Sequence, residues 1–217
     1  AAGAQAVDYV QVVADESYVY VAMRVDTPSG GEDIWMASSM DHGATWNPTL
    51  QANTAAADCD YVSIACEGAN AFVTFADNRN SASEDDLFLR MTHNGGVSWM
   101  MNMLDEQIDE GGPNNGDVEA PELLISGGMT GLVVGWLEDQ TLSSPNDEEL
   151  HIRYSPNGGH MWPLPESTLG AGFDVENPSI AFDGATIIAA WEDDRSGRDE
   201  IYAAVSRDFG LSWTEHS

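Results

Sequence analysis

The strongest constraint on the fold is an octapeptide that occurs four times in 217 residues. Each copy has Ser or Thr first, Asp or Asn third, Gly fifth and Trp eighth, and the copies begin at residues 39, 92, 155 and 206. The tryptophans are separated by 53, 63 and 51 residues, so whole structural units are repeated. The third and eighth positions are Asp41, Trp46, Asn94, Trp99, Asn157, Trp162, Asp208 and Trp213.

The residue types of the octapeptide suit a tight turn between two strands. Asp or Asn can accept hydrogen bonds from nearby backbone N–H groups, and Gly can adopt a positive φ. We expect the Trp to pack the turn against a sheet. The third and eighth residues are therefore predicted to be structural.

Three strand-like segments precede each octapeptide and one follows it, which predicts a four-stranded antiparallel blade in every repeat. The chain is thus expected to be an all-β propeller of four blades in one domain, at about residues 7–53, 59–110, 118–170 and 175–217. Only four residues follow Trp213, so the last outer strand is expected to be truncated.

The octapeptide resembles the Asp box of sialidases and related secreted propellers, and the resemblance covers nearly the whole chain. It implies a turn between the third and fourth strands of each blade, away from the active face. It also implies an extracellular or cell-surface location.

The charge balance narrows the possible partners. There are 37 acidic and seven basic residues, all seven of them arginine, and the net charge is −30. Such a surface repels nucleic acid and suits bound cations or a salt-rich environment. No apolar run is long enough for a membrane span. The two cysteines, Cys59 and Cys66, lie too far apart along one strand for a disulfide and are expected to be free.

Acidic residues recur where the first strand begins, where the second ends and where the third begins. These three positions emerge on one face of an antiparallel blade. The innermost set, predicted to ring a central channel, is Asp8, Asp60, Glu119 and Glu176. Two alternatives follow: the carboxylates bind Ca²⁺ or another hard cation, or they accept hydrogen bonds from backbone N–H groups at blade junctions.

Arginines follow the second strand on the same predicted face, in loops that also carry aspartates. A ligand-binding hypothesis gives them the capture of a carboxylate or sulfate group. The alternative is that they form salt bridges that hold the acidic loops. The residues concerned are Arg79, Arg195, Arg198, Asp77 and Asp193.

Two functions remain open at this point. The first is a non-catalytic binding or interaction module for a cation, a glycan or a protein. The second is a fragment or relic of a sialidase-like glycoside hydrolase. That family uses an arginine triad, a Tyr with a Glu partner and an Asp acid/base, and no catalytic residue maps onto this chain by motif. The short last blade also suggests an oligomer in which a second copy supplies the missing strand.

Overall fold

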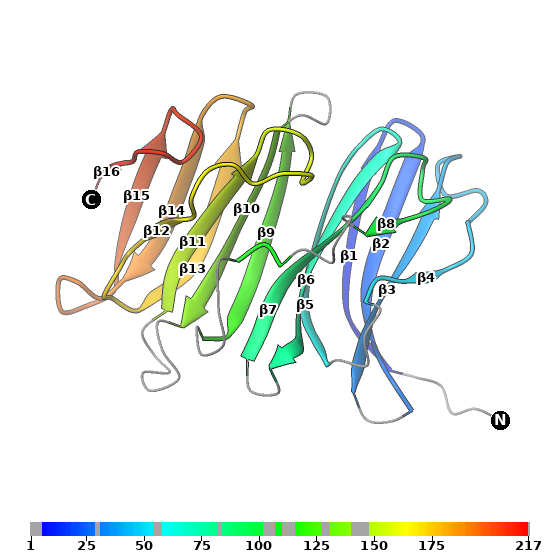
Figure 1. The fold of residues 1–217 in the computed structure, drawn as a ribbon, viewed down its shortest axis with the longest axis horizontal. Helices are drawn as coiled ribbons and strands as arrows, with labels where there is room; N and C mark the ends of the chain where they lie inside the picture. The colour runs from blue at the N-terminus through cyan, green and yellow to red at the C-terminus, as the bar shows by residue number, and fades with distance from the viewer. Residues whose placement is uncertain are drawn as a thin grey trace. The chain divides into compact units, whose positions relative to one another are not determined.

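The computed structural model describes residues 6–28, 31–53, 58–81, 84–101, 107–109, 116–126, 131–139 and 148–216. These residues form four sheets, each of four antiparallel strands, and contain no helix (Figure 1). The predicted all-β fold with four four-stranded blades is therefore confirmed. Among the described residues there is also no helix long and apolar enough to cross a membrane.

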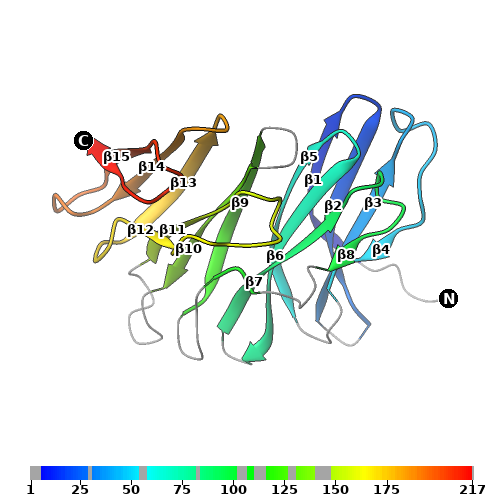
Figure 2. The same ribbon diagram turned by 45° about the horizontal axis from the view of Figure 1, so that its top comes forward.

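Within each sheet the strands lie in chain order, so that neighbours are joined by hairpins (Figure 2). The strands are β1 (Val7–Asp15), β2 (Tyr18–Asp26), β3 (Glu32–Ser39), β4 (Leu50–Gln51), β5 (Cys59–Glu67), β6 (Asn70–Ser81), β7 (Glu84–Thr92), β8 (Met100–Met101), β9 (Val118–Ser126), β10 (Gly131–Asp139), β11 (Glu148–Ser155), β12 (Ser167–Leu169), β13 (Val175–Phe182), β14 (Ile187–Asp193), β15 (Glu200–Ser206) and β16 (Thr214–His216).

The chain divides into two compact units, residues 1–107 and 108–217. The first unit holds the sheets β1–β4 and β5–β8, and the second holds β9–β12 and β13–β16. In each unit the two sheets enclose an apolar core, which includes Tyr20 and Phe75 in the first unit and Leu150 and Trp191 in the second. Alternate side chains are buried along β14 and β15, as expected for sheets packed face to face, whereas β7 and β10 are buried along nearly their whole length.

All four octapeptides form the same hydrogen-bonded turn between the third and fourth strands of a sheet. In the first copy, the Ser39 hydroxyl accepts from the Gly43 N–H at 2.9 Å, and the Asp41 carboxylate accepts from the Thr45 N–H at 2.7 Å. The equivalent bonds recur in the other three copies at 2.8–3.1 Å. The fifth-position glycines all have a positive φ, between 80° and 93°. The predicted role of these glycines is confirmed.

The octapeptide tryptophans differ in burial because of what lies beside them. Trp99 meets Tyr20 of the preceding sheet edge-on at 6.2 Å, Trp213 packs on the core of the second unit, and Trp162 is buried. Trp46 is instead 49% exposed, so its side chain is the least buried of the four. At the same position of the third sheet, the Arg153 guanidinium lies 5.8 Å from the Trp162 ring centroid.

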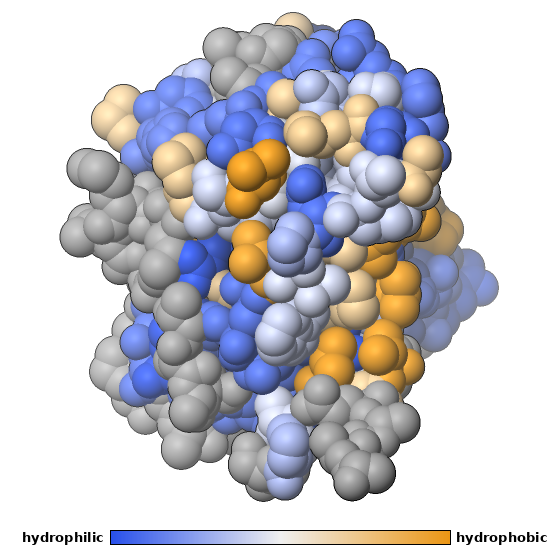
Figure 3. Space-filling model, turned by 90° about the vertical axis from the view of Figure 1, so that its right-hand side faces the viewer, coloured by the Kyte–Doolittle hydropathy of each residue, from blue (hydrophilic) through white to orange (hydrophobic). Residues whose placement is uncertain are grey.

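The same sheet leaves further apolar side chains in contact with solvent. On β1, Val10 and Val12 are 57% and 64% exposed. Figure 3 shows hydrophobic atoms in separate small patches among polar ones on one side of the molecule. Scattered exposure of this kind is ordinary for a protein surface.

The outer strand is short in every sheet. The last one, β16, has three residues, as expected, but β4 and β8 have two each and β12 has three. A short fourth strand is therefore a property of all four sheets. It gives the last sheet no special need for a strand from a second copy.

Both cysteines are free. Cys59 is buried at the start of β5, and Cys66 is partly buried near the end of the same strand. Burial, with a smaller contribution from Asp15, raises the pKa of the Cys66 thiol to about 11. Cys66 is therefore protonated, and a poor nucleophile, at neutral pH.

The octapeptide turns give a pH-dependence prediction. Hydrogen bonds from the Thr45 side chain and backbone lower the pKa of Asp41 to about 2, from an ordinary value of 3.8. The charged carboxylate therefore stabilises the fold above about pH 4, and this contribution is lost as the pH falls through 2. In thermal unfolding, Asp41→Asn should melt below the wild type at pH 6, and the gap should close toward pH 2.

Asn157→Ala is the control, because this copy has no carboxyl group at the third position. Its effect on the melting temperature relative to the wild type should be the same at both pH values. A gap between the wild type and Asp41→Asn that does not change with pH would contradict the role given to the Asp41 charge.

Candidate functional site

The first strand of each sheet has a register shift at the acidic residues predicted to share one face. The shifts lie at Asp8 on β1, beside Asp60 on β5, after Glu119 on β9 and after Glu176 on β13. In the last three strands the next residue is left-handed: Tyr61, Ala120 and Asn177 have φ of 44°, 43° and 50°. Such bulges re-aim side chains and concentrate near functional sites, so this recurrent feature marks a candidate site.

In the first unit, the charge of the bulged acid is compensated by an arginine. Arg24 on β2 donates a hydrogen bond to the Asp60 carboxylate and lies 3.7 Å from a Glu32 carboxylate oxygen. The side chain of Asp8 lies outside the described residues. Asp60 is therefore held by a guanidinium between two neighbouring sheets.

In the second unit, the bulged acids lie near other carboxyl groups. Glu148, at the start of β11, is partly buried, and the charges of Glu119, Asp139, Asp174 and Glu176 all act on it. Burial first, and these four carboxyl groups next, raise the pKa of Glu148 to about 7. The register position of Arg24, opposite Ile34, is occupied here by Leu137, opposite Leu150. This cluster, formed by Glu119, Asp139, Glu148, Asp174 and Glu176, is called the carboxylate cluster below.

Arg79, within β6, and Arg195, two residues after the end of β14, are each bound to the buried aspartate two residues earlier. Arg79 Nε lies 2.7 and 2.9 Å from the two oxygens of Asp77, and Arg195 Nε lies 2.9 and 2.8 Å from those of Asp193. Each guanidinium also covers an aromatic ring of the third strand, at 3.8 Å for Phe88 and 4.0 Å for Tyr202. This arrangement corresponds to the salt-bridge alternative.

Arg195 and Arg198 differ in their surroundings. Burial opposes ionisation of Asp193, but Arg195 and the Trp191 indole hold its pKa below the usual range. Arg195 also pairs with Glu215 at 2.9 Å. Arg198 pairs with Glu200 at 2.6 Å, but its side chain is 78% exposed. Of the two, Arg195 therefore carries the structural role.

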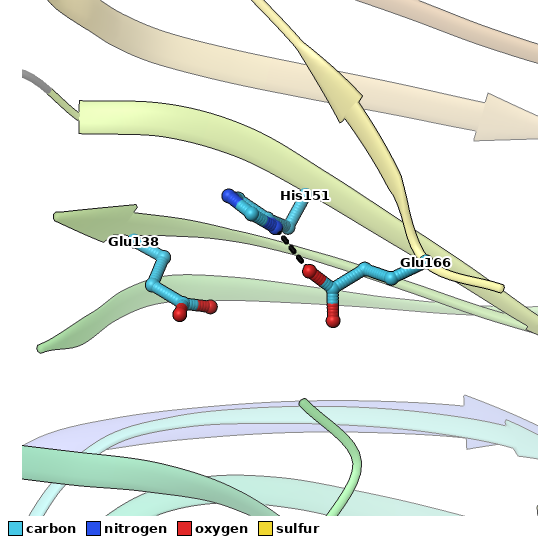
Figure 4. Close-up of side chains that lie close together, drawn as sticks. All are labelled: Glu138, His151 and Glu166. Carbon is cyan, nitrogen blue, oxygen red and sulfur yellow. Dashed lines mark hydrogen bonds and ion pairs between the residues drawn. The ribbon is translucent and has the colours of Figure 1, made fainter. Parts of the chain in front are cut away.

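The third sheet has a different arrangement at the corresponding place. Glu138 on β10, His151 on β11 and Glu166 just before β12 direct their side chains toward one another (Figure 4). One potential ligand atom from each residue lies within 4.8 Å of the others. Glu138 is 3% exposed, and His151 and Glu166 are each 12% exposed at the side chain. These three residues are called the Glu–His–Glu cluster below.

Burial and ion pairing act together in the Glu–His–Glu cluster. Burial raises the pKa of Glu138 to about 7, and His151 and the Trp136 indole oppose this shift. Burial by itself lowers the pKa of His151, but a hydrogen bond with Glu166 and the charges of Glu138 and Glu166 raise it overall. A chemically versatile group of two carboxylates and one imidazole thus lies inside the second unit.

The five histidines show no metal-ligand spacing in the sequence, so the sequence alone predicts no role for them. His151 and Glu166 are brought together because β11 and β12 pair antiparallel, with His151 opposite Thr168. A signal was present in the repeat: His151 stands opposite Trp136, where Phe88 stands opposite Phe75 and Tyr202 opposite Trp191. A polar residue at a position otherwise aromatic marks the site.

The arginine geometry gives a stability prediction. Arg195→Met leaves the buried Asp193 charge without its guanidinium, which should lower the free energy of unfolding by about 3 kcal/mol. Arg198→Met is the matched control, because an exposed pair contributes at most about 1 kcal/mol. Urea unfolding of both variants measures the difference. Equal small losses would contradict the structural role of Arg195.

No protein-family model and no curated protein sequence matches the chain. Solved structures do. The GH93 α-L-arabinofuranosidase of Fusarium graminearum matches with a TM-score of 0.63 and 14% identity, over 97% of this chain and 66% of its own. Trypanosoma rangeli sialidase gives 0.63 and 15%, over 97% of this chain and 38% of its own. Penicillium chrysogenum α-L-arabinanase gives 0.59 and 14%, over 97% and 66%.

The chain thus spans less than two thirds of each of these three proteins. At such identities the likeness concerns the fold, and it agrees with the four-stranded antiparallel sheets and their repeated turns. The chain has the fold of the sialidase-like β-propellers.

Proposed function

We propose that the chain is a non-catalytic, secreted or cell-surface binding module that holds a hard divalent cation at the carboxylate cluster of its second unit. The observation that carries the proposal is that the charges of four other carboxyl groups act on the partly buried Glu148. The five groups come from the start of β9, the end of β10, the start of β11, and the start of β13 with the residue before it.

The contrast between the two units supports a cation. Asp60 has Arg24 as its cationic partner, but Leu137 replaces that arginine beside the second unit's bulged acids. Carboxylates brought together repel one another unless protons, guanidinium groups or a metal ion offset their charge. A cation can perform in the second unit what Arg24 performs in the first.

Oxygen ligands of this kind favour Ca²⁺ among the biological cations. Surface calcium sites of extracellular modules bind with dissociation constants of about 10⁻⁴–10⁻³ M, which suits the calcium concentration outside cells. The proposed location therefore agrees with the proposed ligand.

Three arginines are already paired with aspartates of the chain, which argues against binding of an acidic sugar. Arg24, Arg79 and Arg195 each pair with an aspartate of the chain itself. A sialoside-binding site needs guanidinium groups available for the ligand carboxylate. The glycoside hydrolase alternative is favoured by the similarity of the fold to those of an arabinofuranosidase, an arabinanase and a sialidase.

The cation proposal predicts stabilisation by calcium. At 10 mM CaCl₂ and a dissociation constant near 0.5 mM, binding adds about 2 kcal/mol to the free energy of unfolding. For a chain of this length that corresponds to a rise in melting temperature of about 5 °C. The measurement is thermal unfolding with and without CaCl₂, with NaCl at matched ionic strength as the reference.

Glu148→Gln should abolish most of this rise. Glu200→Gln is the control, because Glu200 is likewise the first residue of the third strand of its sheet but pairs with Arg198. Equal calcium responses in both variants and the wild type would overturn the cation site. Hydrolysis of aryl arabinofuranosides or aryl sialosides by the purified chain would overturn the non-catalytic assignment.

A further inference from the structure

The Glu–His–Glu cluster replaces an arginine-based arrangement found in two other sheets. In the second and fourth sheets an aromatic residue, a buried aspartate and an arginine follow at alternate positions, as in Trp191, Asp193 and Arg195. The third sheet keeps the first two members as Trp136 and Glu138, but its third is Gln140 by sequence, which lies outside the described residues. The buried acid of this sheet is accompanied by His151 instead.

Three carboxyl groups act on His151. Glu166 hydrogen-bonds to its Nδ1, Glu149 lies 3.7 Å from its Nε2, and the Glu138 carboxylate also acts on it. Asp109, which is buried, adds its charge to the environment of Glu138. Three carboxyl groups therefore surround one imidazole in a partly dehydrated place. A divalent cation bound by neutral imidazole would balance the charges of two of them.

Hydrogen bonds from groups outside the cluster also orient the carboxylates that face His151. The Trp136 indole N–H donates to Glu138 Oε2 at 2.7 Å, so the other oxygen remains directed toward the cluster. Glu149 accepts from the Gly172 N–H at 3.0 Å through Oε1, while its Oε2 faces His151 Nε2. Carboxylates placed behind a histidine in this way fix the ring and increase its basicity toward a metal ion.

We propose that Glu138, His151 and Glu166 bind one divalent transition-metal ion, with Zn²⁺ as the representative, through the two carboxylates and His151 Nδ1. Imidazole together with carboxylate suits zinc and its first-row neighbours, whereas Ca²⁺ takes oxygen ligands alone. This site is separate from the carboxylate cluster, because none of its three ligands belongs to that cluster.

The test is isothermal titration of the EDTA-treated full chain with ZnCl₂ in a buffer containing 10 mM CaCl₂. The excess calcium occupies the hard-cation site and weak surface carboxylates. We expect one zinc ion per chain, and affinity at least about 100-fold weaker in His151→Ala. His160→Ala is the matched control, because His160 is exposed and lies in the octapeptide of the same sheet. It should bind zinc like the wild type.

A second measurement avoids dependence on a variant that fails to fold. Histidine side-chain resonances of the ¹⁵N-labelled wild type, recorded as zinc is added, should show a metal-bound nitrogen at His151 and unchanged signals from His42 and His216. Glu166→Gln should weaken binding while retaining a hydrogen-bonding side chain. Absence of zinc binding above the calcium background would overturn the proposal. Undiminished binding in His151→Ala, or no change at the His151 resonance, would also overturn it.

Discussion

Burial of a carboxylate at the end of the second strand is the interaction on which much of the rest depends. Asp77, Glu138 and Asp193 occupy this place in three sheets, and each is less than 4% exposed. A charge in this environment costs several kcal/mol unless it is paired and hydrogen-bonded. In two sheets a guanidinium pairs with the carboxylate and covers an aromatic ring. In the third, the partners are an indole, an imidazole and a further carboxylate.

The turn and the bulge recur in all four sheets, whereas the partners of the buried carboxylate differ between sheets. The octapeptide closes each sheet by the same hydrogen bonds. The bulge on β5 then places Asp60 beside Arg24 of the neighbouring sheet. Arg24 meets that acid in the first unit, and Leu137 stands at the same register position in the second. One architecture thus carries two different charge environments.

Sequence alone predicted the fold well because the octapeptides and their spacing are direct signatures of the turn and the repeat. The engagement of Arg79 and Arg195 by Asp77 and Asp193 was also among the alternatives, since the pairs are two residues apart in the chain. The burial of the tryptophans was only partly predictable, because Trp46 is 49% exposed whereas Trp162, at the same octapeptide position, is buried. The Glu–His–Glu cluster was missed, because Glu166 lies 15 residues beyond His151 and reaches it only through the pairing of β11 with β12.

The most direct test of the account gives the third sheet the charge arrangement of the fourth. The variant combines Glu138→Asp, Gln140→Arg and His151→Tyr, and the measurement is its free energy of unfolding in metal-free buffer, with zinc content determined afterwards. The account predicts stability within about 1 kcal/mol of the metal-free wild type and no bound zinc, because the guanidinium replaces the imidazole and its ion. A loss of several kcal/mol, or zinc retained at one ion per chain, would contradict it.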